Sequence, residues 1–227
     1  KTADDQPPYL VAGLRSDTGR NAMDGITYDA GLAGVVGDTG RLVAFEISLD
    51  GGPPRDARAL IAMNVTGEHR FQLTTAELET LCGGALADGP HTVQLTARDA
   101  HGNVAQPFEV SFTLDRLPPA PPAPLELPAE YDSGARDDDR VTQITNPVLR
   151  TDAEPGSIVR LFADEMPLVQ AVSPGTLELA AMRMGLRGGV YAFTATAEDL
   201  AGNVSDTPPP LLVTIDVTPP AVQEWGL

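Results

Sequence analysis

Polar and apolar residues alternate in two stretches of the chain. Val93, Leu95 and Ala97 share one face of an expected strand over residues 91–97, with polar residues between them. The same alternation recurs over residues 108–114, where it places Phe112 on the apolar face. A period of two is typical of antiparallel strands with one buried face. We expect His91, a polar residue at the start of the first stretch, to point outward.

Short apolar runs bounded by turn residues predict the other strands. These runs lie at residues 9–14, 32–36, 42–49, 60–65 and 69–73, and then at 125–131, 148–150, 158–163, 168–172, 177–179, 191–197 and 211–215. One short helix is also expected. Thr74 and Glu77 have the spacing of a capping box, which begins a helix that runs to about Cys82 and stops at Gly83-Gly84.

One long pattern occurs twice. Residues 97–104 (ARDAHGNV) recur as 197–204 (AEDLAGNV), and each copy is followed by a strand and then by a pair of prolines. A repeat at this distance predicts two copies of one module. We therefore expect an all-β chain of two tandem antiparallel β-sandwiches, over residues 1–117 and 118–227, with the short helix inserted in the first. The proline-rich run at 117–124 is the expected linker, and a stiff linker favours an end-to-end arrangement.

The charge balance narrows the choice of partners. The 227 residues carry 32 acidic and 15 basic side chains, for a formal net charge of −17. Nucleic-acid binding is excluded because phosphate contacts need clustered Lys and Arg. Membrane insertion is not expected, since no apolar run approaches the roughly 20 residues of a membrane helix. Because Thr218-Pro219-Pro220 repeats the linker pattern, we interpret the chain as part of a longer tandem protein.

Four elements of the second half occur in a characteristic order: DSG followed by Asp-x-x-Thr (132–142), AEPG followed by Val (153–159), AEDLAGNVS (197–205) and IDVTPP (215–220). In this order and spacing they resemble the bacterial immunoglobulin-like repeats of large extracellular adhesins, so both expected β-sandwiches are expected to be immunoglobulin-like. The resemblance covers nearly all of the second module and both ends of the first. It implies secretion or surface display, arrays that act as extenders, and, in several members of the family, calcium held at module junctions.

Aspartates in a repeated loop are the candidate ligands for a metal ion. Asp17 and Asp24 have the same spacing as Asp132 and Asp139, and each pair is followed by a threonine three residues after its second aspartate. In a sandwich of this kind the loop and the end of the last strand lie at the same end, so Asp115 is expected near the first pair, and in the second module Asp216 near the second pair. Converging carboxylates repel one another unless a cation joins them. Calcium takes six to eight oxygen ligands and fits such a cluster. The alternative is that these are solvated turn aspartates.

The turn between the last two strands adds two further candidates. Asp199 and Asn203 of the second module, which correspond to Asp99 and Asn103 of the first, are expected to face the first module's loop across the linker and to complete a calcium site there. The competing interpretation is structural, because Asp and Asn side chains commonly hydrogen-bond to the backbone of tight turns.

The sequence predicts no catalytic site. The three histidines share no metal spacing, and no Gly-x-Ser-x-Gly elbow is present. The predicted function is a non-enzymatic spacer or adhesion module, extracellular or on the cell surface, whose partners are neighbouring modules of the same chain and a surface or matrix protein or glycan. The alternative is a carbohydrate- or protein-binding accessory domain of a secreted multidomain enzyme. Exposed aromatic residues on a sandwich face would favour the accessory domain, and bare polar faces would favour the spacer.

Overall fold

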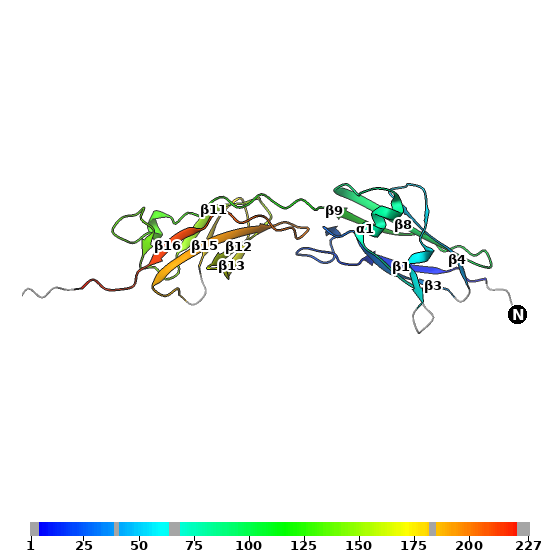
Figure 1. The fold of residues 1–227 in the computed structure, drawn as a ribbon, viewed down its shortest axis with the longest axis horizontal. Coiled ribbons are helices and arrows are strands. Elements are labelled where there is room, and N and C mark those ends of the chain that lie inside the picture. The colour runs from blue at the N-terminus through cyan, green and yellow to red at the C-terminus, as the bar shows by residue number, and fades with distance from the viewer. Residues whose placement is uncertain (1–4, 39–40, 64–68, 182–184, 222–227) are drawn as a thin grey trace, which may run out of the picture. The chain divides into compact units, whose positions relative to one another are not determined.

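The computed structural model describes residues 5–38, 41–63, 69–181 and 185–221. The chain forms two compact units, with the boundary after Leu117. Each unit is a β-sandwich, as the sequence predicts, and one short α-helix lies in the first (Figure 1). The strands pair antiparallel except for one short strand in each unit, β2 (Ile26–Thr27) or β10 (Val141–Thr142), which runs parallel to the last strand. No helix in the described ranges is long and apolar enough to cross a membrane.

The first unit packs a four-stranded sheet, in the order β1-β3-β7-β6, on a five-stranded sheet, in the order β2-β9-β8-β4-β5. Its elements are β1 (Tyr9–Leu14), β2 (Ile26–Thr27), β3 (Leu32–Gly37), β4 (Leu42–Leu49), β5 (Arg55–Asp56), a 3-10 turn (Arg58–Leu60), β6 (Ile61–Met63), β7 (His69–Leu73), α1 (Thr75–Cys82), β8 (Gly89–Asp99) and β9 (Phe108–Leu114). The expected strand at 60–65 is thus β6, and its last two residues lie outside the described residues.

The second unit repeats the larger sheet in the order β10-β16-β15-β12-β13, opposite the pair β11-β14. Its elements are a 3-10 turn (Ala129–Tyr131), β10 (Val141–Thr142), β11 (Val148–Asp152), β12 (Ile158–Ala163), β13 (Met166–Val172), β14 (Thr176–Ala180), β15 (Gly189–Glu198) and β16 (Leu211–Ile215). The strand predicted at 125–131 is wrong: this stretch makes only one bridge, between Glu126 and Arg150, before the 3-10 turn. Pro124 and Pro128 flank the bridge and have no N–H to donate to a ladder.

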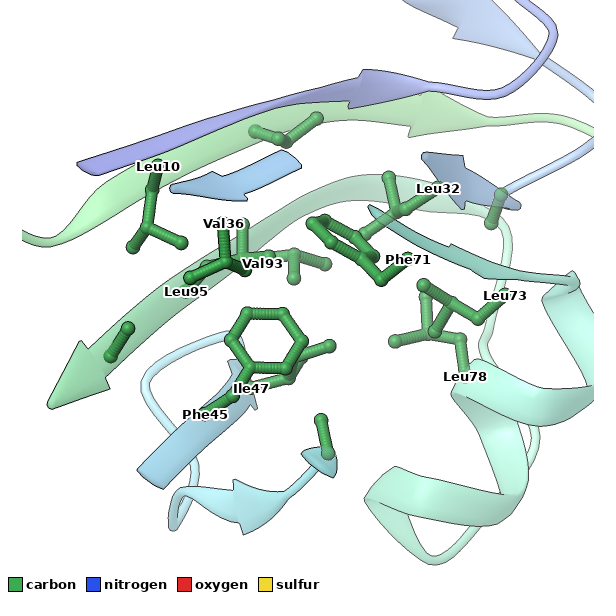
Figure 2. Packing of buried hydrophobic residues seen from close by; sticks show 14 of the residues in the cluster. Leu10, Leu32, Val36, Phe45, Ile47, Phe71, Leu73, Leu78, Val93 and Leu95 are labelled. Atoms are coloured by element: carbon green, nitrogen blue, oxygen red, sulfur yellow. The ribbon is translucent and has the colours of Figure 1, made fainter. Parts of the chain in front are cut away.

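Each unit has its own hydrophobic core. In the first, the rings of Phe45 and Phe71 lie 5.0 Å apart between the sheets, and Leu78 from α1 points at Leu73 at one end of the sandwich (Figure 2). The alternation in β9 places Phe112 in this core with 4% of its surface exposed, which confirms the face expected from the sequence. The core of the second unit is centred on Phe193, Leu161 and Leu179, all essentially buried.

The helix α1 begins and ends as predicted. Thr74 caps it through the reciprocal capping box with Glu77, and Gly83 ends it in the left-handed conformation, with φ of +89°. Leu78, on its inner face, is fully buried. The helix therefore closes one end of the first sandwich.

Candidate functional site: the repeated aspartate loops

The first aspartate of each loop accepts a backbone hydrogen bond from the far side of its own loop. Oδ2 of Asp17 accepts from the N–H of Gly25 at 2.9 Å, and Oδ2 of Asp132 accepts from the N–H of Arg140 at 2.8 Å. Both bonds span eight residues. In both units, therefore, the conserved spacing of the repeat corresponds to one carboxylate that closes the loop.

The second aspartate makes a local turn. Oδ1 of Asp24 accepts from the N–H of Ile26, and Oδ1 of Asp139 accepts from the N–H of Val141, each at 3.0 Å. An Asp side chain that accepts from the amide two residues on forms an Asx-turn. This turn leads directly into the short strand that follows, β2 in the first unit and β10 in the second.

The threonine of the motif is fully buried in both units. The hydroxyl of Thr27 lies 3.0 Å from that of Thr18, and the hydroxyl of Thr142 lies 3.0 Å from that of Ser133. Each threonine hydroxyl also accepts a backbone N–H from two residues ahead, at 3.0 Å. The hydroxyl thus joins the two sides of the loop from the inside, and its burial is matched by hydrogen bonds.

The third aspartate lies at the end of the last strand. The N–H of Asp115 donates to the carbonyl of Thr27 at 2.9 Å, and the N–H of Asp216 donates to the carbonyl of Thr142 at 2.8 Å. One carboxylate oxygen of each accepts from the amide two residues on, at 3.0 and 2.9 Å. The backbones of these aspartates are thus adjacent to the loop, as the sequence predicts.

The carboxylates themselves do not form a recognisable metal centre. Asp17 and Asp24 line one surface depression together with Ser111. Among the described residues, however, no group of three or more His, Cys, Asp or Glu side chains lies close enough to hold a metal ion. The second carboxylate oxygens of the loop-closing aspartates, Oδ1 of Asp17 and Oδ1 of Asp132, are buried and have no hydrogen-bond partner within the described protein. Equivalent oxygens are thus unpaired in both units.

The turns between the last two strands are closed by an Asp–Asn pair. Oδ1 of Asp99 accepts from the N–H of Asn103 at 2.8 Å, and Oδ2 accepts from its side-chain amide at 2.7 Å. Asp199 and Asn203 repeat both bonds at 2.9 Å. Burial acts to raise the pKa of Asp99, but the bonds from Asn103 and the neighbouring amides lower it overall. The structural interpretation explains the pattern in both units.

The prediction that the side chain of His91 points outward is wrong. Its side chain lies on the core side of β8, opposite Phe112, with the two ring centres 5.6 Å apart. His91 shares the parity of Val93 and Leu95, so the alternation contained this signal. The prediction instead followed the polar character of histidine. The hydrogen-bond partner that allows this ring to be buried, Asp50, is 41 residues away in the sequence and gives no local signal.

The outer face of the large sheet in the first unit is polar over its middle. Thr92, Gln94 and Thr96 of β8 alternate with the core residues of that strand, and Glu109, Ser111 and Thr113 do the same in β9. The corresponding face of the second unit mixes Thr194 and Thr196 with the exposed apolar residues Val190 and Leu212. Among the described residues of β8, β9, β15 and β16, no aromatic side chain points outward, but Phe162 of β12 lies opposite Thr194 and therefore shares the outer face of the second unit's large sheet.

Together, the two packed sheets, the parallel pairing of a short early strand with the last strand, and the closed Asp–Asn turn define an immunoglobulin-like β-sandwich. Residues 119–217 match the family model of the bacterial Ig-like domain. This match covers most of the second unit and confirms the resemblance seen in the sequence. No curated protein matched the chain.

Among solved structures, the chain is similar to the fibronectin(III)-like modules of Clostridium thermocellum CbhA, with 12% identity, a TM-score of 0.48, and coverage of 91% of this chain and 93% of that one. It is similar to latent PorU from Porphyromonas gingivalis, with 17% identity, a TM-score of 0.39 and coverage of 94% of this chain, although it spans only 21% of PorU. A tetra-tandem repeat from the extending region of a large adhesion protein gives 21% identity, a TM-score of 0.30, and coverage of 92% and 50%. These TM-scores are low, so the assignment rests on the topology and the family match.

Proposed function

We propose that the chain is a non-enzymatic, load-bearing spacer in a tandem array of Ig-like modules, displayed outside the cell. The observation that carries the proposal is the pairing of the short strand after the aspartate loop with the last strand of its unit. β2 runs parallel to β9, with Ile26 opposite Thr113, and β10 runs parallel to β16, with Val141 opposite Thr214.

Parallel pairing determines how each unit meets tension along the chain. When the short early strand and the last strand of a unit are parallel, the chain enters the first at one end of the sandwich and leaves the second at the opposite end. A pull on the two ends of the unit therefore acts along both strands. The hydrogen bonds between them are then loaded together, in shear, whereas strands pulled apart sideways lose their bonds one after another. In the first unit these bonds run from Thr113 to the carbonyl of Gly25 at 2.7 Å and from Asp115 to that of Thr27 at 2.9 Å.

The aspartate loop holds the same residue that takes the load. Gly25 is bonded through its N–H to Asp17 and through its carbonyl to Thr113. In the second unit Arg140 is bonded through its N–H to Asp132 and through its carbonyl to Thr214, at 2.8 Å each. The repeated motif thus fixes the start of the loaded strand in both units, a role that needs no ligand.

The polar outer face of the first unit supports a spacer over a carbohydrate-binding accessory domain. Sugar-binding surfaces commonly use exposed aromatic rings, whose faces stack on the ligand. Thr92, Gln94 and Thr96 offer hydrogen bonds without such a platform. The alternative within this class is adhesion to a surface or matrix partner. Binding of the chain to immobilised glycans or matrix proteins would favour adhesion over a purely mechanical role.

Calcium is a second candidate component of this function, and one observation favours it. The buried Oδ1 atoms of Asp17 and Asp132 have no hydrogen-bond partner among the described residues, and a bound cation or an ordered water would satisfy them. An ion bound only by the folded loop would raise the stability of the unit by mass action.

The test of the spacer is single-molecule stretching of the full chain with one backbone donor removed. Thr113→Pro deletes the N–H that bonds Gly25, whereas the matched control Thr113→Val keeps it. We expect Thr113→Pro to lower the unfolding force of the first unit alone, and Thr113→Val to leave both units unchanged. Equal forces in the two variants would remove the mechanical basis of the proposal.

A further inference from the structure

Both ring nitrogens of His91 face oxygen atoms. Nδ1 lies 2.8 Å from Oδ2 of Asp50, in the turn after β4, and Nε2 lies 2.7 Å from the carbonyl oxygen of Ala87, in the connection from α1 to β8. The side chain is 10% exposed. One imidazole therefore connects two segments that lie far apart in the sequence.

Neither oxygen can donate a hydrogen bond while Asp50 is ionised. A neutral imidazole carries one N–H, so it satisfies one of these acceptors and turns a lone pair toward the other. Only the imidazolium, with two N–H groups, satisfies both. Asp50 is held for this contact, because its N–H donates to the carbonyl of Thr92 and its Oδ1 accepts from the N–H of Thr92, both at 2.8 Å.

We propose that His91 is a pH-sensitive tether, which fastens the α1–β8 connection to the β4 turn when protonated and releases Ala87 when it loses its proton. Asp50 keeps the remaining N–H, because a carboxylate is a stronger acceptor than a neutral carbonyl. The α1–β8 connection is then held less tightly at neutral and alkaline pH than at mildly acidic pH.

The charged groups around the ring agree with this direction. Partial burial acts to lower the pKa of His91, but the Ala87 carbonyl and the Asp50 carboxylate raise it overall above its ordinary 6.5. Arg116, after β9, opposes protonation. The guanidinium of Arg116 also forms ion pairs with Asp88 at 2.9 Å and with Glu79 at 3.4 Å. The Ala87 carbonyl and the Asp50 carboxylate together therefore set the direction of the shift in the pKa of His91.

Release of Ala87 is local, since other bonds hold the same connection. Arg116 donates to the carbonyl of Leu86 at 2.6 Å, and the N–H of Leu86 donates to Oε1 of Glu79 at 3.0 Å. The tether therefore changes the order of residues 84–88 and leaves the sandwich folded.

The test is an NMR titration of the full chain from pH 5 to pH 9, following the ring of His91 and the backbone amides of residues 84–88. We expect the ring to titrate above 6.5, and the amides of Ala87 and Asp88 to shift with the same midpoint. Asp50→Asn removes the carboxylate charge and should lower that midpoint. His101→Gln, in the β8–β9 turn, is the control variant and should leave the titration of residues 84–88 unchanged.

Two results would overturn the tether. One is a ring that titrates at or below 6.5 in the unmodified chain. The other is a ring that titrates while the amides of residues 84–88 stay constant. Both are read in the unmodified chain, so they do not depend on the folding of any variant.

Discussion

Replacement of Phe112 by alanine should destabilise the first unit and leave the second unaffected. Phe112 is 4% exposed, lies on the inner face of β9 and contacts the ring of His91. Truncation of a buried phenylalanine typically costs about 3–5 kcal/mol, because the lost transfer free energy is joined by the cost of the cavity. The folding equilibrium of the unit then falls by about a hundredfold to a few thousandfold, since about 1.4 kcal/mol corresponds to a factor of ten.

Hydrogen exchange measured by mass spectrometry is the suitable assay, because it reports the opening free energy of peptides from each unit separately. Peptides from β8 and β9 should lose most of their protection in Phe112→Ala. Peptides from β15 and β16 should not change, since the core of the second unit contains none of the same residues. Thr113→Ala is the matched control, because the neighbouring side chain points outward and is exposed.

A change within about 0.5 kcal/mol, which is the range of surface positions, would contradict a stabilising role for buried Phe112. Equal loss of protection in both units would contradict the independence of the two cores. Either result would show that burial on one face of β9 does not determine the stability of the first sandwich alone.

Three further outcomes follow from the loops. Thr142→Val leaves buried polar partners unsatisfied and should cost the second unit about 1–3 kcal/mol by hydrogen exchange, whereas Thr214→Val, on the outer face, should cost little. The pKa of Asp99 is lower in the folded state than its ordinary 3.8, so the contribution of this carboxylate to the free energy of unfolding is complete above pH 3.8. That contribution is lost as the pH falls through the folded pKa, so urea midpoints should drop below about pH 4. Calcium binding predicts heat in calorimetric titration of the chain that is lost in an Asp17→Ala, Asp115→Ala double mutant; no heat in either protein would leave the loops purely structural.

The strands and the helix could be predicted because their signals are local. The alternation in β8 and β9, the capping box at Thr74 and the repeated turns all act within a few residues, and the structure follows them. The stretch at 125–131 shows the limit of this reasoning. Its apolar residues are typical of a strand, but its prolines cannot continue a ladder, and only one bridge forms.

The roles of the aspartates could not be read from the sequence in the same way. A carboxylate that closes a loop and one that binds calcium have the same residue type and the same spacing. The difference lies in which amide each oxygen meets: Asp17 meets Gly25 and Asp132 meets Arg140, both eight residues away. For His91 the sequence did contain the signal, because the residue alternates in step with Val93 and Leu95 and so belongs to the inner face. Its two hydrogen-bond acceptors, Asp50 and Ala87, can be identified only in the folded structure.

The most direct test of the load-bearing role is to stretch the full chain between its two ends and to record each unfolding event. We predict two separate events, each releasing roughly 300–400 Å of chain, as expected for units of about 110 residues. Both should occur at forces above that of the first unit in Thr113→Pro. A chain that extends smoothly, or that yields at the force of this variant, would contradict a spacer built on parallel terminal strands.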